Sequence, residues 1–474
     1  MSRQPSKDTA ATRLAGLQRT MGTQATSEGD KTVLTVSNLT GRTAVLNRPK
    51  ALNSLTLDMV DALAKHLQAW EASELVNVVM LRSNSPRAFC AGGDVVAVSR
   101  DWQAGRHEQA MRFFQHEYQV NHHIATYTKP LVAMLDGYTM GGGVGLSVHA
   151  AFRVASEQTV FAMPETKIGF FPDVGATFFL PRMDGETGTY LGLTGQQLRG
   201  RDLLYAGIAT HYVPAERFPL LEQRLQGLGT ADYDVANAAI EEFSAQPEDA
   251  AIEYSLAPVR QAIDRCFRFN TVESIIAALE EESRGSANAV HAEWAARTLE
   301  QLGQMSPSSL KLTLEQLRNG RDVNIQQAFT LELRTAEKRL DSHDMHEGID
   351  ALLVRKSNDA KWDPAELGAI DMKALSRQYF SGEFSRKLRF VHDQVAFSEY
   401  PHKYGLPTED EVKMLVTGSN PQAGTLAPTQ DNVLRYFDLE YQQKIGVSRK
   451  VALVLALKTK LASDGETLEW VDHQ

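Results

Sequence analysis

Between residues 31 and 185 the chain alternates short apolar segments of strand length with longer segments of helical periodicity. The short segments, such as "VNVVMLRS" and "KPLVAMLDG", are nearly continuous apolar runs, which is typical of strands buried on both faces. Segment 107–125 carries its apolar residues at helical spacing and is predicted to be a helix. The repetition of this pattern predicts an α/β core.

Beyond about residue 185 the strand pattern disappears. Residues 186–355 show helical periodicity, and after residue 364 the sequence becomes polar and aromatic-rich before one last apolar helix, "KVALVLALKTKLAS". A glycine-started helix is also expected over 141–150. The expected parts are a leader, an α/β core, a helical region and a C-terminal extension, over residues 1–30, 31–225, 226–380 and 381–474.

The charge balance and the cysteines limit the classes of protein to which the chain can belong. With 49 basic and 59 acidic residues the net charge is −10, which argues against a surface that binds nucleic acid throughout. No run of about 18 uncharged apolar residues occurs, so no membrane span is expected. Cys90 and Cys266 are too few for a disulfide framework, and Cys90 is interpreted as a small buried hydrophobe because no histidine is near it in sequence.

The first thirty residues have the composition of a targeting segment. Four basic residues face one acid before Glu28, and serine and threonine are frequent. Leu14, Leu17 and Met21 fall on one face of a helix. This pattern favours a mitochondrial presequence and a mitochondrial location, and the alternative is a disordered polar tail.

Two glycine-rich turns, "AFCAGGD" at 88–94 and "MGGGVGLS" at 140–147, each follow a predicted strand. Neither has the spacing of a phosphate-binding loop or of a dinucleotide fingerprint, so no nucleotide cofactor is expected. Such turns expose backbone N–H groups that can stabilise a negative oxygen, although both could also be ordinary tight turns.

The segment "PETKIGFFPDVGATFFLPR" at 164–182 places Glu165 and Asp173 among apolar residues, where isolated charges are costly. Pro164 is expected to end a strand and so deliver Glu165 at the exit of that strand. Asp173 could cap a short helix, "VGATFFL", or take part in chemistry. Burial and proximity would raise the pKa values of both acids and leave one as base or nucleophile and the other as proton holder. The expected apolar wall consists of Phe170, Phe171, Phe178 and Phe179.

Four segments in this order, "LNRPKALNSL", "AFCAGGD", "DGYTMGGGVGLS" and "MPETKIGFFPDVGATFFLPR", resemble the enoyl-CoA hydratase/isomerase (crotonase) superfamily. Within it the chain is most similar to the 3-hydroxyisobutyryl-CoA hydrolases. The resemblance covers about residues 31 to 380. It implies an α/β fold, a crotonase-type spiral of β-β-α turns followed by a helical C-terminal part.

The resemblance also implies a catalytic site. The N–H groups of Gly93 and Gly142 would form an oxyanion hole, and Glu165 and Asp173 would be the catalytic acids that also contact the substrate. Hydratases of the superfamily usually carry a glutamate where this chain has Gly145. Addition of water to a double bond is therefore disfavoured.

Further positions match the family less firmly. Glu117 resembles a substrate-contacting glutamate, although the family often has an acid at His116, and a solvated helix residue is the alternative. Lys50 and Ala51 fall where the superfamily binds CoA, with a surface ion pair as the alternative. No metal is expected, because His122 and His123 are interpreted as histidines on a helix surface.

The implied activity is hydrolysis of small 3-hydroxyacyl-CoA thioesters, above all 3-hydroxyisobutyryl-CoA in valine catabolism. Coenzyme A is then part of the substrate, and no separate cofactor is expected. Glu165 could attack the carbonyl directly or activate water. The alternatives are a structural component of the mitochondrial ribosomal small subunit built on the hydrolase fold, and an enoyl-CoA hydratase or isomerase.

The extension after residue 380 departs from compact hydrolases. Basic and aromatic side chains interleave in it, a composition suited to docking on a partner: Arg386, Lys387, Arg389, His402 and Lys403 with Phe390, Phe397, Tyr400 and Tyr404. The expected partners are a small acyl-CoA substrate, a second copy of the chain and, through the extension, a mitochondrial ribosome or another protein or RNA.

Overall fold

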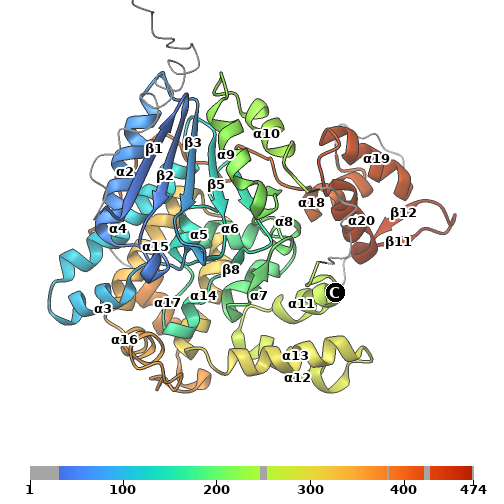
Figure 1. The fold of residues 1–474 in the computed structure, drawn as a ribbon. Coiled ribbons are helices and arrows are strands. Elements are labelled where there is room, and N and C mark those ends of the chain that lie inside the picture. Colours follow the sequence, from blue (N-terminus) through green and yellow to red (C-terminus); the bar gives the residue numbers. More distant parts are fainter. Residues whose placement is uncertain (1–30, 246–253, 382–383, 421–426, 472–474) are drawn as a thin grey trace, which may run out of the picture.

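The computed structural model describes residues 31–245, 254–381, 384–420 and 427–471. The predicted presequence lies outside the described residues. Two sheets form the core, and their strands are largely parallel (Figure 1). The larger has the order β1 (Val33–Asn38), β2 (Gly41–Leu46), β3 (Val78–Ser83), β5 (Leu131–Leu135), β7 (Phe152–Ala155) and β10 (His211–Tyr212). The smaller has the order β4 (Ala88–Cys90), β6 (Tyr138–Met140), β8 (Val160–Ala162) and β9 (Leu198–Arg199).

Each turn of the fold places one strand in the large sheet, the next strand in the small sheet and then a helical segment. The segments that follow the strand pairs are α3 (Val95–Gln103) and α4 (His107–Ala125), then α5 (Gly142–Gly145), then the 3-10 helix η2 (Glu165–Ile168) and α6 (Ala176–Phe179). The expected spiral of β-β-α turns is thereby confirmed. Because β4, β6 and β8 run parallel, their carboxyl ends meet at one edge of the small sheet.

Several predicted elements agree closely with the structure. Helix α2 (Leu57–Glu71) begins at Thr56, whose side chain accepts a hydrogen bond from Met59 N at 3.4 Å. Helix α4 begins and ends at the predicted residues. Both helices bury their apolar faces in the core. Local spacing of apolar residues therefore sufficed to place these helices.

Two predictions were wrong. The helix expected over 141–150 is only α5, and the residues after it form turns, because glycines favour close packing over continued helix. Strands do occur beyond residue 185, namely β9, β10 and a hairpin of β11 (Thr459–Leu461) and β12 (Leu468–Trp470). Strands of two or three residues are too short to leave an alternating pattern in the sequence.

Helices cover the core after residue 186, as predicted. They are α7 (Thr187–Thr194), α8 (Asp202–Tyr205), α9 (Phe218–Gln226), α10 (Tyr233–Glu241), α11 (Arg260–Phe267), α12 (Val272–Gly285), α13 (Ala289–Leu302), α14 (Pro307–Gly320), α15 (Ile325–Leu340), α16 (His343–Ile349) and α17 (Met372–Phe380). Helix α15 packs against α4 and α6 and so lies beside the loop that precedes α6.

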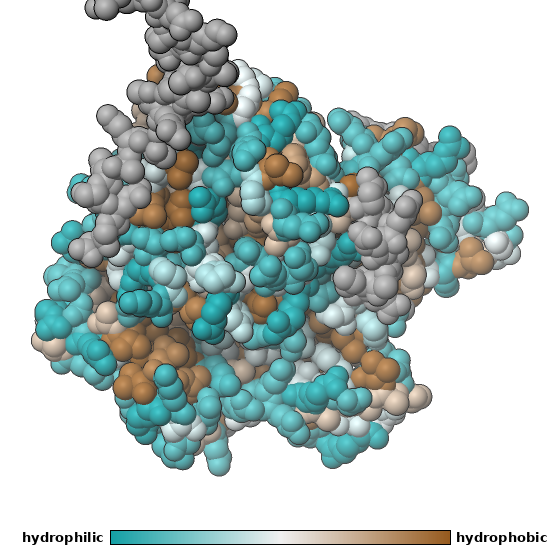
Figure 2. Space-filling model, in the orientation of Figure 1, coloured by the Kyte–Doolittle hydropathy of each residue, from teal (hydrophilic) through white to brown (hydrophobic). Residues whose placement is uncertain are grey.

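The extension begins as an irregular segment, residues 384–408, here called the strap, and it ends as a separate lobe. Its helices are α18 (Glu409–Val416), α19 (Gln430–Glu440) and α20 (Val447–Lys458), which together with the β11–β12 hairpin form the red lobe of Figure 1. The surface of the lobe and of the core is predominantly hydrophilic on the face shown in Figure 2. Among the described residues, no helix combines the length and apolar character needed to cross a membrane.

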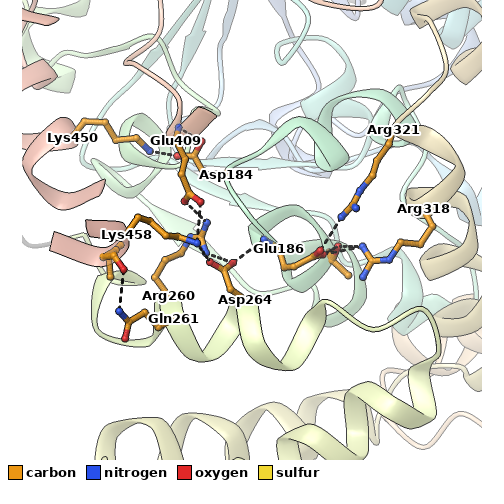
Figure 3. A network of polar contacts seen from close by, with 12 residues as sticks. Asp184, Glu186, Arg260, Gln261, Asp264, Arg318, Arg321, Glu409, Lys450 and Lys458 are labelled. Atoms are coloured by element: carbon orange, nitrogen blue, oxygen red, sulfur yellow. Dashed lines mark hydrogen bonds and ion pairs between the residues drawn. The ribbon is translucent and has the colours of Figure 1, made fainter. Parts of the chain in front are cut away.

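Buried ion pairs join this lobe to the core (Figure 3). On α20, Lys450 contacts Asp184 at 2.5 Å and Lys458 contacts Asp264 at 2.8 Å. Lys458 also lies 3.0 Å from Glu409 of α18, which in turn contacts Arg260 of the core at 3.1 Å. Charges on the inner face of the lobe are thus matched by opposite charges of the core.

Most of the basic and aromatic pattern that suggested a docking surface packs within the chain. Arg386 pairs with Glu108 at 2.6 Å and with Glu337 at 2.7 Å. The Phe390 ring lies 4.0 Å from the ring of His122 between centroids, and the rings of Phe397, Tyr400, His402 and Tyr404 also make aromatic contacts. The exposed members of the basic set are Lys387, Arg389 and Lys403.

Candidate active site

Gly93 and Gly142 lie together at the carboxyl edge of the small sheet. Gly93 follows β4, and Gly142 opens α5 just after β6, the parallel neighbour of β4. A Cβ placed on Gly142 would lie 3.3 Å from the backbone nitrogen of Gly93. Within the described part of the chain, neither of these two N–H groups donates a hydrogen bond. The structure therefore provides two neighbouring backbone donors, and their binding of an acyl oxygen stays a prediction.

Glu165 lies beside the glycine turn that contains Gly142. Pro164 precedes Glu165, the first residue of η2. Glu165 therefore lies just after the end of β8, as predicted from the sequence. A Cβ placed on Gly141 would lie 2.9 Å from Glu165 Oε1, and Glu165 is 6% exposed. Its Oε2 has no hydrogen-bond partner in the described residues. Burial first, and then the nearby Asp173, raises the pKa of Glu165 well above its ordinary value.

Asp173 does not cap a helix. The N-cap of α6 is Gly175, and Asp173 Oδ2 instead accepts a hydrogen bond from the Tyr118 hydroxyl at 2.7 Å. The capping alternative was wrong because two residues, Val174 and Gly175, intervene in a left-handed conformation before the helix starts. Burial raises the pKa of Asp173 to about 7, and the Tyr118 hydrogen bond offsets part of that rise.

Glu117 belongs to the same cluster and is not a solvated helix residue. It is 2% exposed on the inner face of α4, and a Cβ on Gly142 would lie 2.4 Å from its Oε1. That oxygen has no hydrogen-bond partner among the described residues. Burial, followed by the charges of Asp173 and Glu165, raises the pKa of Glu117 well above its ordinary value. Within the described residues, none of these three acids forms an ion pair.

The four phenylalanines of the predicted apolar wall lie in the hydrophobic core, and their contact with the acids stays a prediction. Phe170, Phe171, Phe178 and Phe179 are all buried. A Cβ on Gly145 would be 2.7 Å from both Asn121 Oδ1 and the Val174 side chain. No space exists for a glutamate at this position unless its neighbours move.

Two buried polar residues beside the acids were missed from the sequence. Tyr118 directly follows Glu117, and its hydroxyl reaches Asp173. Glu332, on the apolar face of α15, accepts hydrogen bonds from Gly175 N at 2.7 Å and Thr177 N at 2.9 Å, and burial raises its pKa to about 8. An acid within the apolar stripe of a predicted helix was the signal that could have identified Glu332.

Lys50 and Ala51 form the end of a 3-10 helix, η1 (Pro49–Ala51), on the surface. The chain that follows is tied to the glycine turn, because Ala91 N donates to Leu52 O and Leu55 N donates to Gly92 O. Lys50 is exposed and forms no ion pair with the described residues. Contact of this corner with CoA stays a prediction.

The expectation of surface histidines was wrong. His122 and His123 are 0% and 1% exposed, because α2, α15 and the strap of the extension together enclose α4. His123 Nε2 lies 2.8 Å from Glu71 Oε2, and His392 Nε2 lies 3.1 Å from the same oxygen. Each contact joins a histidine ring nitrogen to the carboxylate of Glu71. The expected absence of a resident metal stays a prediction.

Cys90 lies under the glycine turn and is fully buried, in agreement with the sequence-based interpretation. Burial raises the pKa of its thiol to about 12, so a reactive thiolate is disfavoured. The thiol of Cys266 is also buried, and burial raises its pKa to about 12. Neither cysteine supplies a nucleophile to the site.

A sequence model of the enoyl-CoA hydratase/isomerase family matches residues 41–380. The mitochondrial 3-hydroxyisobutyryl-CoA hydrolase of Danio rerio is 39% identical over 366 residues, which cover 77% of this chain and 94% of that protein. The crystal structure of a carnitinyl-CoA dehydratase from Mycobacterium thermoresistibile matches with a TM-score of 0.69 and 36% identity, over 77% of this chain and 100% of that one.

The small ribosomal subunit protein mS47 of Neurospora crassa is 42% identical over 480 residues, which cover 97% of this chain and 93% of that protein. This match extends into the extension, whereas the family model ends at residue 380. The two kinds of relative therefore share the core and differ in whether they share the extension. On these matches, the chain belongs to the enoyl-CoA hydratase/isomerase family, in the group that contains the 3-hydroxyisobutyryl-CoA hydrolases.

Proposed function

We propose that this chain hydrolyses the thioester of small 3-hydroxyacyl-CoAs in mitochondria, with 3-hydroxyisobutyryl-CoA as the favoured substrate. The observation that carries the proposal is the cluster of three buried acids that have no ion-pair partner among the described residues, beside two backbone N–H groups that donate no hydrogen bond to those residues. Mitochondrial relatives named for this reaction support the substrate and the compartment. Glu165 and Asp173 are the residues proposed to perform the chemistry.

The two N–H groups of Gly93 and Gly142 would hold the thioester oxygen as it becomes negative. A single donor of this kind typically contributes roughly 10²–10³ in rate. Oxygen attack on the carbonyl carbon breaks the C–S bond, and the electron pair leaves with the CoA thiolate. The attacking oxygen belongs either to Glu165, which forms an anhydride that water then hydrolyses, or to water from which Glu165 takes a proton.

Simultaneous ionisation of the three acids is disfavoured, because their charges repel and burial raises the pKa of each of them. An acid that is ionised can act as nucleophile or base, while a neighbour that keeps its proton can deliver it to the leaving thiolate. Asp173, which accepts a hydrogen bond from the Tyr118 hydroxyl, is the residue proposed to carry that proton and to contact the 3-hydroxyl of the substrate.

Release of free thiol from 3-hydroxyisobutyryl-CoA tests the proposal. The wild-type chain should release thiol, and Glu165→Ala and Asp173→Ala should each lose most of the rate with unchanged circular dichroism. An equal rate in Glu165→Ala would overturn the assignment. Appearance of oxygen-18 in Glu165 after a single turnover in labelled water would show direct attack by the carboxylate.

The same preparation can test the hydratase alternative with crotonyl-CoA. The lack of an acid at Gly145 predicts that hydration is much slower than thioester cleavage. Hydration as fast as cleavage would favour a hydratase.

A second candidate function is that of a structural component of the mitochondrial ribosomal small subunit. The Neurospora crassa relative favours it, because its similarity includes the extension. Sedimentation of endogenous protein through a sucrose gradient tests this candidate, since a ribosomal component should co-migrate with small-subunit rRNA. A protein found only at the top of the gradient would count against it. The two functions are compatible in one chain, because the acids and the lobe are separate parts of it.

A further inference from the structure

The side chain of Tyr400 links the extension to the loop that carries Asp173, through His149. The Tyr400 hydroxyl lies 2.7 Å from His149 Nδ1, and His149 Nε2 lies 2.7 Å from the carbonyl oxygen of Val174. Val174 is the residue directly after Asp173. Since the family model ends at residue 380, this contact is an addition made by the extension.

The chemistry of the groups fixes the direction of both hydrogen bonds. A carbonyl oxygen only accepts, so His149 Nε2 must carry the proton that is donated to Val174. His149 Nδ1 is then the acceptor, and the Tyr400 hydroxyl donates to it. Burial lowers the pKa of His149 to about 4, so the ring is neutral near neutral pH and this arrangement is maintained.

The loop that receives this contact needs external support. Val174 is a β-branched residue with φ of +54°, a conformation that such residues rarely adopt and that the surrounding structure must hold. Glu332 holds the N–H groups of Gly175 and Thr177. His149 contacts the carbonyl oxygen of Val174 and so holds the peptide that joins Val174 to Gly175, directly after Asp173.

Tyr400 is itself firmly placed against the core. Its ring packs edge-on to Phe178, with 5.2 Å between the ring centroids, and lies 5.7 Å from Phe397. Arg182 stacks over the Phe178 ring at 3.8 Å and donates to the carbonyl oxygen of Ser398 at 3.0 Å. The strap is therefore fixed on the segment that follows the acid-bearing loop.

We propose that Tyr400 is a positioning residue for the hydrolase site, and that through His149 the extension sets the conformation of the loop that bears Asp173. This inference rests on the proposed thioesterase function for its kinetic consequence. A partner that lifts the strap from the core would lower the activity. Conversely, substrate that orders the loop would favour the docked strap, because such coupling is reciprocal.

The substitution Tyr400→Phe tests the proposal, with Tyr404→Phe as the matched control. Phenylalanine keeps the ring packing and removes only the hydroxyl, which leaves His149 Nδ1 without its donor. Tyr404 lies in the same strap, but its hydroxyl donates to Asp234 of α10, remote from the loop. We expect Tyr400→Phe to lower kcat about tenfold with KM within about twofold, and the control to leave both unchanged.

Amide hydrogen exchange of the peptide that contains residues 173–178 gives a second readout that does not need activity. Exchange should be faster in Tyr400→Phe than in Tyr404→Phe, while peptides of the β-sheets exchange as in the wild type. Faster exchange in a protein whose wild type releases no thiol would uphold the positioning of the loop and overturn the hydrolase function instead. Equal exchange and equal kcat in the two variants would overturn the role of Tyr400.

Discussion

Two buried groups of charged side chains in this molecule follow opposite rules. In the acid cluster, Glu117, Glu165 and Asp173 lie together with no cation paired to them in the described residues, and burial raises the pKa of each. At the seam between core and lobe, burial alone would raise the pKa of Asp184, but Lys450 and the N–H of Glu409 more than offset it, and the pKa is lowered. The acids at the seam are paired with cations, whereas the acids of the cluster are not paired with any cation of the described residues.

The difference indicates what each group is for. A buried acid with a cation partner holds two parts of a chain in register, while the loss of one partner leaves an uncompensated charge. Buried acids without a partner reduce stability and persist where chemistry needs a proton to move near neutral pH. The acid cluster therefore has the electrostatics that the proposed catalytic role requires, and the seam has those of a structural joint.

The largest expected effect is on catalysis at the acid cluster. Gly142→Ala would place a methyl group 2.4 Å from Glu117 Oε1 and 3.3 Å from Gly93 N, where the acyl oxygen is proposed to bind. We expect kcat for thiol release to fall by about 10²–10³, because the methyl group would keep the acyl oxygen from the N–H pair and so have an effect similar to the loss of one oxyanion donor. Gly227→Ala, whose Cβ would approach no atom closer than 3.6 Å, is the control. A Gly142→Ala enzyme with the wild-type rate would refute the oxyanion site.

The next effect concerns stability at the seam. Lys450→Met leaves Asp184 buried without its cation, and we expect the free energy of unfolding in urea to fall by about 3–5 kcal/mol. The double variant Asp184→Asn/Lys450→Met should recover much of this loss, because no charge is then left unpaired. Arg297→Met, which breaks an exposed pair with Glu293, should change stability little. Equal destabilisation by Arg297→Met and Lys450→Met would remove the distinction between seam and surface.

A smaller change in stability is expected at the acid cluster, where removal of a charge should stabilise the protein. The pKa of Asp173 rises from 3.8 to about 7 on folding, so its ionisation reduces stability progressively as the pH rises from about 4 to about 7. Asp173→Asn cannot ionise and should be more stable than the wild type by about 2–4 kcal/mol at pH 8, at about 1.4 kcal/mol per pKa unit. At pH 4 the two proteins should differ little on this account. If the stability of Asp173→Asn relative to the wild type fell between pH 4 and pH 8, the claim that Asp173 is buried without a paired cation would be contradicted.

The sequence predicted elements with a strong local signal. Helices α2 and α4 were placed from the spacing of apolar residues, and Glu165 was placed at a strand exit by Pro164. The glycines of the two turns were identified because close approach of backbones requires that residue type. What these features share is that residues near in sequence determine them.

Features that depend on distant residues were missed. Asp173 was assigned a capping alternative because the sequence does not show that Tyr118 lies opposite to it. His122 and His123 were placed on a surface because nothing local shows that the strap covers α4. The same strap explains why Arg386, which pairs with Glu108, was interpreted as part of a docking surface. Long-range packing decides each of these cases.

The pH dependence of kcat/KM for thiol release from 3-hydroxyisobutyryl-CoA tests the central claim. The claim is that the acid cluster, which has no paired cation among the described residues, performs catalysis. The rate of the wild-type chain, after subtraction of the Glu165→Ala background, should pass through a maximum between pH 5 and pH 8. It should rise as Glu165 loses its proton, and fall as Asp173, whose pKa burial raises to about 7, loses the proton that it delivers to the thiolate. A folded chain that releases no thiol at any pH, or one whose rate is unchanged across this range, would contradict it.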